Sequence, residues 1–134
     1  MAYAQWVYIL IQSKIASGEI SIRNVNLNWG KFYQWDNKDN EISVDAVKKI
    51  VIASSKTAGV ASCGRSDASS GTEGSFDLYD SDTKICNIYW DCPWGSKTNT
   101  FTVGSFDDDY MVQATGANLN SGAIGTVNVK VAKF

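Results

Sequence analysis

The sequence predicts an all-β fold, a β-sandwich formed by one domain. Short apolar segments alternate along the chain with clusters of Gly, Asn, Asp and Ser. Many short strands at regular spacing are typical of a sandwich or a barrel. A chain of 134 residues, 44% of them hydrophobic, can bury a core but is too short for two ordinary domains. We therefore expect residues 1–134 to form a single domain.

The strands can be placed by their apolar patterns. Residues 5–12 are an almost unbroken apolar and aromatic run, which indicates a strand buried on both faces. In residues 20–29 the apolar positions change parity at Arg23 and Asn24, which indicates a β-bulge or a bend that passes the strand between sheets. Further strands are expected at residues 76–78, 85–90, 101–103, 110–114 and 127–131, the last with the cleanest alternation.

One segment does not follow the strand pattern. Ser43 can cap a single helical turn within residues 43–50, with Val44 and Val47 facing inward. Turns are expected where Asp, Asn, Ser and Gly cluster. These clusters are residues 36–40, 69–71, 80–82, 107–109 and 118–122.

Composition excludes several functions. Histidine is absent, which removes the commonest general base, the Ser-His-Asp and Cys-His arrangements and every metal site that uses His. We expect no enzyme, no cofactor and no metal, although an enzyme that uses paired carboxylates does not need histidine. Twelve basic and fourteen acidic side chains leave a net charge of -2 without long blocks of either sign. Nucleic acid is excluded as a partner, and a membrane target should be neutral or zwitterionic.

The cysteines and the N-terminus bear on the compartment. Cys63, Cys86 and Cys92 cannot all pair within one chain, so free buried thiols are favoured, with one disulfide left open. No apolar stretch approaches the ~20 residues of a membrane-spanning helix. The first residues carry no positive leader, so we expect no signal peptide, cytoplasmic synthesis and non-classical secretion.

Residues 90–100 are the most informative segment. Trp90 and Trp94 flank Pro93, the only proline of the chain, and Gly95 and Lys97 follow. Because proline restricts its own φ and the residue before it, this segment is a stiff turn that can hold an indole ring outward. An indole beside an ammonium group suits the boundary between lipid tails and headgroups. The segment therefore predicts contact with a lipid surface.

The other aromatic residues have competing interpretations. Trp90 ends a dense apolar strand and is expected in the core. Core packing and lipid contact are both open for Trp6 and Trp29, which have apolar neighbours, whereas Trp35 is expected to be a partly exposed loop anchor. Lys97 is either a solvated turn lysine or a contact for the phosphate of a lipid headgroup.

Five blocks in this order resemble the aegerolysin family: residues 2–7, 28–31, 64–74, 90–100 and 121–125. The chain looks more like Asp-haemolysin and the bacterial members than the ostreolysin-type members. The resemblance implies a β-sandwich similar to the actinoporins and a lipid-facing surface. Positions that match the family's lipid-facing groups and the loop beside them are Trp6, Trp29, Arg65, Asp67, Ser70, Trp94 and Lys97.

Two of these positions carry further expectations. Ser70 stands where ostreolysin-type members have a glutamate associated with cholesterol-complexed sphingomyelin, so that specificity is not implied here. Arg65 and Asp67 either form a pair that stiffens their loop or contact a ligand.

The resemblance implies a protein that recognises sphingolipids, notably ceramide phosphoethanolamine, on raft-like domains at the surface of a target membrane. It also implies the lipid-recognising half of a two-component cytolysin or haemolysin, whose pore is made by a perforin-like (MACPF) protein. A lectin-like module is the alternative, because exposed Trp and Tyr beside Asn, Asp and Lys also stack on sugar rings. An enzyme would need paired carboxylates in an apolar pocket, which the sequence does not place.

Overall fold

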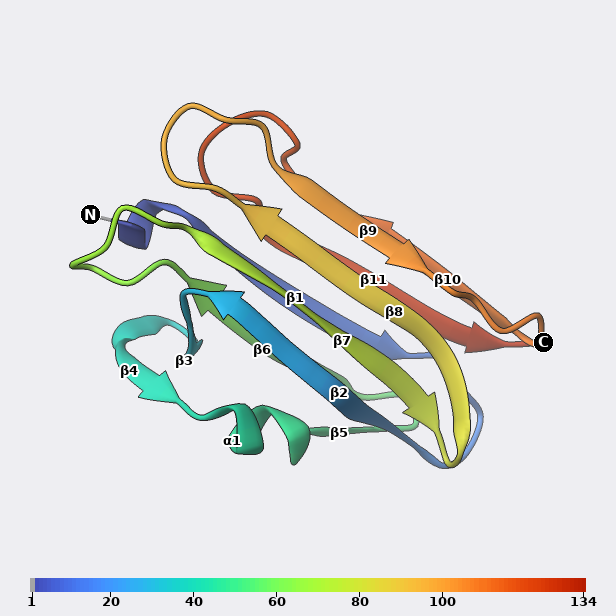
Figure 1. The fold of residues 1–134 in the computed structure, drawn as a ribbon. Helices are drawn as coiled ribbons and strands as arrows, with labels where there is room; N and C mark the ends of the chain where they lie inside the picture. Colours follow the sequence, from blue (N-terminus) through green and yellow to red (C-terminus); the bar gives the residue numbers. More distant parts are fainter. Residues whose placement is uncertain (1) are drawn as a thin grey trace.

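Two packed β-sheets make up most of the structure, a computed structural model that describes residues 2–134 (Figure 1). The six-stranded sheet has the order β10-β11-β1-β6-β3-β4, and the five-stranded sheet has the order β5-β2-β7-β8-β9. The predicted single-domain β-sandwich is therefore confirmed. The strands are β1 (Trp6–Ser13), β2 (Glu19–Trp29), β3 (Lys31–Gln34), β4 (Asn37–Ile42), β5 (Val51–Ala53), β6 (Thr57–Cys63), β7 (Thr72–Asp80), β8 (Thr83–Cys92), β9 (Thr100–Gly104), β10 (Tyr110–Thr115) and β11 (Gly125–Lys133).

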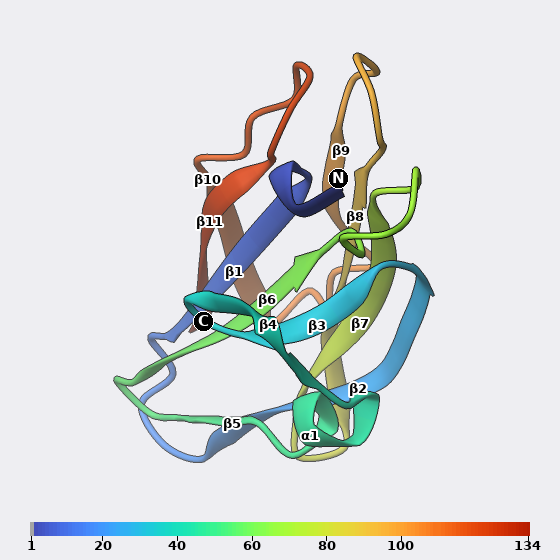
Figure 2. The same cartoon turned by 90° about the vertical axis from the view of Figure 1, so that its left-hand side faces the viewer.

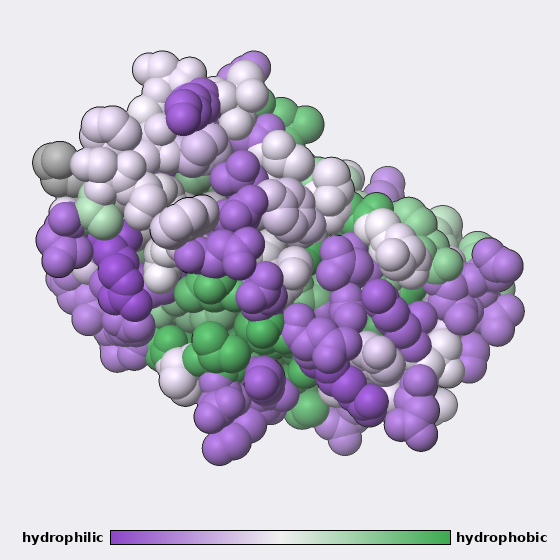
Figure 3. Space-filling view, in the orientation of Figure 1, coloured by the Kyte–Doolittle hydropathy of each residue, from purple (hydrophilic) through white to green (hydrophobic). Residues whose placement is uncertain are grey.

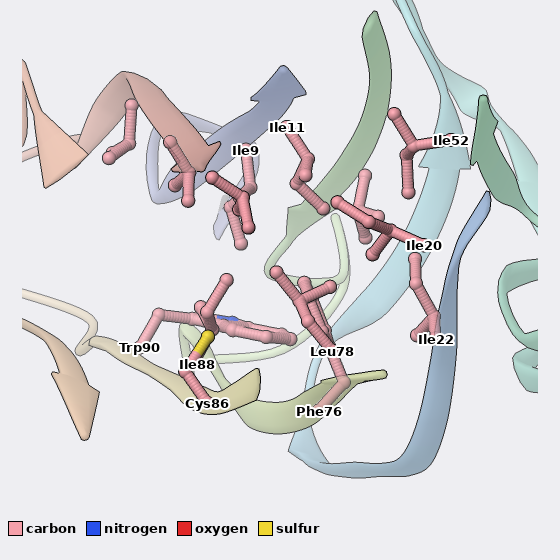
Figure 4. Packing of buried hydrophobic residues seen from close by; sticks show 14 of the residues in the cluster. Ile9, Ile11, Ile20, Ile22, Ile52, Phe76, Leu78, Cys86, Ile88 and Trp90 are labelled. Atoms are coloured by element: carbon pink, nitrogen blue, oxygen red, sulfur yellow. The ribbon is translucent and has the colours of Figure 1, made fainter. Parts of the chain in front are cut away.

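The core lies between the two sheets. In Figure 4, Ile9 and Ile11 of β1 point towards the side of Leu78 and Ile88 from the five-stranded sheet, and all four are fully buried. The expectation that the first strand is buried on both faces is wrong in part. Alternate residues of β1 are buried, but those between them, such as Tyr8, are only half-buried. The outer face of β1 is covered by aromatic side chains rather than by a second sheet.

The parity change in β2 is a β-bulge. Its pairing with β7 shifts register between Arg23 and Asn26, and Asn24 has a positive φ of 56°. The strand continues in the same sheet beyond this point, so the alternative of a crossing between sheets does not hold. Trp29 at its end then pairs with Glu73 of β7.

The predicted helical turn is confirmed as α1 (Val44–Lys48). The Ser43 hydroxyl accepts a hydrogen bond from the backbone N–H of Ala46 at 3.0 Å, as an N-cap residue does. Val47 is fully buried and Val44 is partly buried against the core.

The turn expected at residues 36–40 is confirmed only at its start, because Trp35 and Asp36 form the turn and β4 (Asn37–Ile42) begins within the expected range. This strand is at the edge of the six-stranded sheet and its sequence is mostly polar. Edge strands tolerate polar and charged residues on both faces, so a polar edge strand and a loop have similar sequences.

The three cysteines are free and buried, as favoured from the sequence. Burial raises the pKa of Cys86 to about 12 and that of Cys92 to about 11. Over residues 2–134, no helix has both the length and the apolar character needed to cross a membrane. The face shown in Figure 3 is mainly hydrophilic and carries a hydrophobic area below its middle, with further hydrophobic areas towards its right side.

Candidate functional site

A row of paired residues crosses one end of the five-stranded sheet. Trp29 of β2 pairs with Glu73 of β7, and Glu73 pairs with Asp91 of β8. Residues that pair directly across strands lie on the same face of a sheet. Since Trp90, the neighbour of Asp91, points into the core, this row lies on the outer face. The sheet therefore presents an indole and two carboxylates side by side.

A hollow of about 300 Å³ lies over this row, between the β6–β7 loop and the β8–β9 loop. Four of the residues predicted from the sequence meet here, although they come from three separate parts of the chain. The lining residues are Trp29, Ser69, Ser70, Gly71, Thr72, Glu73, Asp91, Pro93, Trp94 and Lys97.

Both indoles at the hollow are exposed. The side chain of Trp29 is 58% exposed and that of Trp94 is 40% exposed, whereas Trp90 is fully buried. The expected exposure of Trp94 and the expected burial of Trp90 are confirmed, and the question left open for Trp29 is answered in favour of exposure. Gly95, with a φ of +92°, allows the backbone to turn directly after Trp94.

The β8–β9 loop that carries Trp94 is fixed by Asn99. The Asn99 amide donates hydrogen bonds of 2.9 Å to the carbonyl oxygens of Asn118 and Gly122. Its backbone N–H donates to the carbonyl oxygen of Asn120 at 3.0 Å. Figure 2 shows the β8–β9 and β10–β11 loops rising together at one end of the sandwich. A buried side chain therefore joins the two loops and limits the positions that Trp94 can take.

The β6–β7 loop packs closely against the Pro93 turn because Gly71 has no side chain. A Cβ atom at Gly71 would collide with the carbonyl oxygen of Cys92. Gly30, with a φ of +90°, is similarly close to the carbonyl oxygen of Cys63. These two glycines bring Trp29, Ser70 and the Pro93 turn to the edge of one hollow.

The hollow contains charges of both signs. Glu73 accepts hydrogen bonds from the Tyr89 hydroxyl and, at 3.0 Å, from the Asn28 amide. Burial and the facing Glu73 raise the pKa of Asp91, while Lys97 acts in the opposite direction. Lys97 is exposed and forms no ion pair with another residue of the described chain. Its ammonium group is therefore available at the rim.

A chain of buried hydroxyls lies beneath the hollow. The Ser62 hydroxyl donates to the Lys31 carbonyl oxygen at 2.8 Å, so its oxygen accepts the hydrogen bond that the Thr72 hydroxyl donates at 2.6 Å. Thr72 in turn accepts from the Trp90 indole N–H at 3.0 Å. Every donor in this series has an acceptor, which fixes β3, β6, β7 and β8 relative to one another.

Arg65 and Asp67 do not line the hollow. Both Arg65 Nη atoms donate to Glu41, each at 2.9 Å, so Arg65 ties the β6–β7 loop to β4. This bidentate pair raises the pKa of Arg65 and lowers that of Glu41. The expected pair between Arg65 and Asp67 is therefore corrected to Arg65 and Glu41, and Asp67 is exposed.

Trp6 also lies away from the hollow. It is half-buried on the outer face of the six-stranded sheet, where its ring centroid is 5.5 Å from that of Trp35. The Lys38 ammonium is 5.3 Å from the Trp6 ring centroid. Of the two interpretations left open for Trp6, packing within an aromatic cluster is the one that the geometry favours.

Sequence reasoning missed Glu73, Asp91 and Leu119. The carboxylates come together only through the pairing of β7 with β8, and the sequence does not reveal which strands are neighbours. Leu119 is 52% exposed in the β10–β11 loop, and its carbonyl oxygen accepts a hydrogen bond from Asn99. The sequence signal that could have identified Leu119 is a single large apolar residue in a loop rich in Gly and Asn.

The fold and the site define a β-sandwich binding protein with exposed indoles around a charged hollow. The aegerolysin family model matches residues 4–134. Asp-hemolysin of Aspergillus fumigatus is 49% identical over 132 residues, which cover 98% of this chain and 95% of that protein. Ostreolysin A6 of Pleurotus ostreatus is 43% identical over 136 residues, which cover 99% of this chain and 98% of that protein.

Two solved structures have a similar fold and a similar sequence. RahU protein, crystallised in complex with a TRIS molecule, matches with a TM-score of 0.94 and 41% identity over 99% of this chain and 98% of that one. IP-1A from Alcaligenes faecalis matches with a TM-score of 0.89 and 39% identity over 98% of this chain and 93% of that one. The chain belongs to the aegerolysin family, whose members are membrane- and lipid-binding proteins.

Proposed function

We propose that this protein recognises the zwitterionic headgroup of a membrane sphingolipid, ceramide phosphoethanolamine, at the hollow between Trp29 and Trp94. The observation that carries the proposal is the presence of one free ammonium and two carboxylates between exposed indoles. Lys97 is the contact for the phosphate, and Glu73 and Asp91 are the contacts for the ethanolammonium group. The protein binds the lipid and performs no chemistry on it.

The two carboxylates support a cationic ligand group. Glu73 and Asp91 are directly opposite each other on neighbouring strands, and like charges in that position destabilise a sheet. An ammonium group between them relieves this repulsion and donates hydrogen bonds to both. An anionic headgroup without an amine would leave the repulsion in place.

The indoles support an interfacial position for the hollow. Trp29 and Trp94 are exposed at the same hollow, and Leu119 is exposed in the loop that Asn99 joins to the Trp94 loop. Indole is favoured at the level of lipid headgroups, with its ring towards the apolar side and its N–H towards water. This end of the sandwich therefore approaches the surface of the target membrane.

We further propose that the protein is the lipid-recognising component of a two-component cytolysin, acting on raft-like sphingolipid domains outside the cell that makes it. A separate perforin-like (MACPF) protein would then form the pore. This part of the proposal rests on the aegerolysin family and on the haemolysin name of a relative. Mixing this protein and a candidate partner with dye-loaded vesicles tests it, and leakage with the partner alone would contradict it.

Flotation of the protein with vesicles tests the headgroup assignment. We expect binding to vesicles of phosphatidylcholine, cholesterol and ceramide phosphoethanolamine, and loss of that binding in Trp94→Ala and Lys97→Ala. Phe106→Ala is the matched control, because Phe106 is 52% exposed in the β9–β10 loop, which joins the opposite end of β9 from the Trp94 loop. Binding that survives Trp94→Ala, or that depends on Phe106, would contradict the proposal.

The carboxylates are tested separately. Replacing both by amides, Glu73→Gln with Asp91→Asn, should weaken binding to ceramide phosphoethanolamine and reduce its preference over ceramide phosphate, which lacks the amine. An unchanged preference would show that the amine is recognised elsewhere. Glycan-array binding in the absence of vesicle binding would favour the lectin-like alternative instead.

A further inference from the structure

The two carboxylates of the headgroup hollow differ in their contacts. Glu73 accepts one hydrogen bond at each of its two oxygens. The Asp91 carboxylate forms no hydrogen bond or ion pair with another side chain within residues 2–134. Both residues are half-buried and lie directly opposite each other on β7 and β8. One carboxylate is therefore fixed by its neighbours, and the other is free to follow a ligand.

Asn28 reaches Glu73 because β2 is irregular at its end. The pairing of β2 with β7 shifts register between Leu27 and Trp29, and Asn28 and Trp29 are both exposed although they are consecutive. In a regular strand, consecutive side chains lie on opposite faces. The irregularity lets Trp29 line the hollow while the Asn28 amide donates to Glu73 Oε1 at 3.0 Å.

Asn26 sets the orientation of the Asn28 amide. The Asn26 side-chain amide donates to Asn28 Oδ1 at 3.2 Å, so the Asn28 NH₂ group is the part that faces Glu73. Leu27, between the two asparagines, packs against the core. A series of two side-chain amides therefore ends on one oxygen of Glu73.

Tyr89 holds the other oxygen of Glu73 from the neighbouring strand. It lies two residues before Asp91 on β8, so both side chains are on the outer face of the sheet. Its hydroxyl donates to Glu73 Oε2. This hydrogen bond and burial raise the pKa of Tyr89, so the hydroxyl is protonated at neutral pH and acts as the donor. Donors from β2 on one side and β8 on the other fix the carboxylate of Glu73.

The fixed carboxylate still has acceptor positions for a ligand. A carboxylate oxygen can accept two hydrogen bonds, so Glu73 keeps one position on each oxygen. An ethanolammonium group has three N–H donors and can donate to Glu73 and Asp91 together. A trimethylammonium group has no N–H and gains only the attraction between charges. Discrimination between the two headgroups therefore depends on how firmly Glu73 is held.

We propose that Tyr89, together with Asn28, is a positioning residue that makes the hollow select a primary ammonium over a trimethylammonium headgroup. The inference rests on the proposed headgroup site and extends it to two residues that do not line the hollow. Tyr89 and Asn28 act through Glu73, whose free acceptor positions they keep beside Asp91. Asp91 then adjusts to the position of the bound amine.

Vesicle titration of the intact protein tests this selection. The vesicles contain phosphatidylcholine, cholesterol and either ceramide phosphoethanolamine or sphingomyelin, whose headgroup ends in trimethylammonium. We expect the wild type to prefer ceramide phosphoethanolamine and Tyr89→Phe to reduce this preference about three- to tenfold, the loss of one oriented hydrogen bond. Asn28→Ala should reduce it in the same direction. The melting temperature of Tyr89→Phe should stay near that of the wild type, because Glu73 is half-buried and water can replace the hydroxyl.

Tyr79→Phe is the matched control. Tyr79 is on the same strand as Glu73, but it does not line the hollow, and its ring contacts the Arg23 guanidinium at 4.4 Å. This variant should keep the preference of the wild type. In a Glu73→Gln background, where the carboxylate is gone, Tyr89→Phe should cause little further loss of preference.

The outcomes separate this inference from the proposed function. If the wild type prefers ceramide phosphoethanolamine and Tyr89→Phe keeps that preference, the positioning role is overturned and the headgroup site stands. Equal weakening with both vesicle types, or an equal loss of preference with and without the Glu73 carboxylate, would show a general structural effect and would also overturn it. A wild type that binds neither vesicle type would overturn the headgroup site, and the positioning role with it.

Discussion

Replacement of Thr72 by valine tests the hydroxyl chain beneath the headgroup hollow. Valine has nearly the shape of threonine but cannot accept the hydrogen bond that the Trp90 indole donates at 3.0 Å. Thr72 is 1% exposed and Trp90 is fully buried, so water cannot readily replace the lost acceptor. The variant leaves a buried indole N–H unsatisfied and ends the series that runs through Ser62 to the Lys31 carbonyl.

The magnitude follows from the group left without a partner. An unsatisfied buried donor costs about 1–3 kcal/mol, so we expect the free energy of unfolding to fall by about 2 kcal/mol. For a chain of this length, that corresponds to a decrease of roughly 6 °C in melting temperature. Urea denaturation followed by tryptophan fluorescence gives the free energy, and a thermal scan gives the melting temperature.

Thr102→Val on β9 is the matched control, because Thr102 is exposed. It should change the free energy of unfolding by less than about 0.5 kcal/mol. If Thr72→Val is as stable as this control, the indole N–H has another acceptor and the reasoning about the hydroxyl chain is refuted.

Three further predictions concern the site and the thiols. Burial and a facing carboxylate raise the pKa of Asp91, so its charged form destabilises the fold, and Asp91→Asn should raise the melting temperature at pH 7. This gain should disappear as the pH falls through the pKa of Asp91 in the folded protein towards the ordinary value of 3.8. A gain that is constant with pH would contradict the prediction. Asn99→Ala should weaken vesicle binding and lower the free energy of unfolding by about 1–3 kcal/mol, because the Asn118 and Gly122 carbonyls lose the hydrogen bonds that the Asn99 amide donates. Unchanged vesicle binding would show that Trp94 does not need this support. All three thiols should react with Ellman's reagent only after denaturation, and a count of one would indicate a disulfide.

Local patterns in the sequence predict the strands and the helical turn well. The capping position of Ser43, the bulge near Asn24 and the burial of Trp90 each depend on residues close together in the chain. The polar edge strand β4 was missed for the same reason, because its residues look like a loop when the neighbouring strand is not known.

The headgroup hollow is predictable only in part. The Pro93 turn identifies Trp94 and Lys97 from local sequence, and the family resemblance adds Trp29 and Ser70. The contribution of Glu73 and Asp91 depends on the register between β7 and β8, which is set by packing of the whole sheet.

Contacts between distant parts of the chain also explain why Arg65 and Trp6, which were predicted as site residues, lie away from the headgroup hollow. Arg65 finds Glu41 on the edge strand β4, a partner 24 positions away, rather than Asp67 in its own loop. Trp6 packs near Trp35 because the β3–β4 turn brings the second indole back over the outer face of β1. No pattern within either segment indicates these contacts.

The central claim is that the indoles of Trp29 and Trp94 enter the interface of a membrane that displays ceramide phosphoethanolamine. Fluorescence quenching by brominated phosphatidylcholine in such vesicles measures this entry directly. We predict strong quenching of the wild type and a large reduction in the Trp29→Phe, Trp94→Phe double variant, with Trp35→Phe behaving as the wild type. Quenching that is unchanged in the double variant, or absent when the wild type is bound, would contradict the claim.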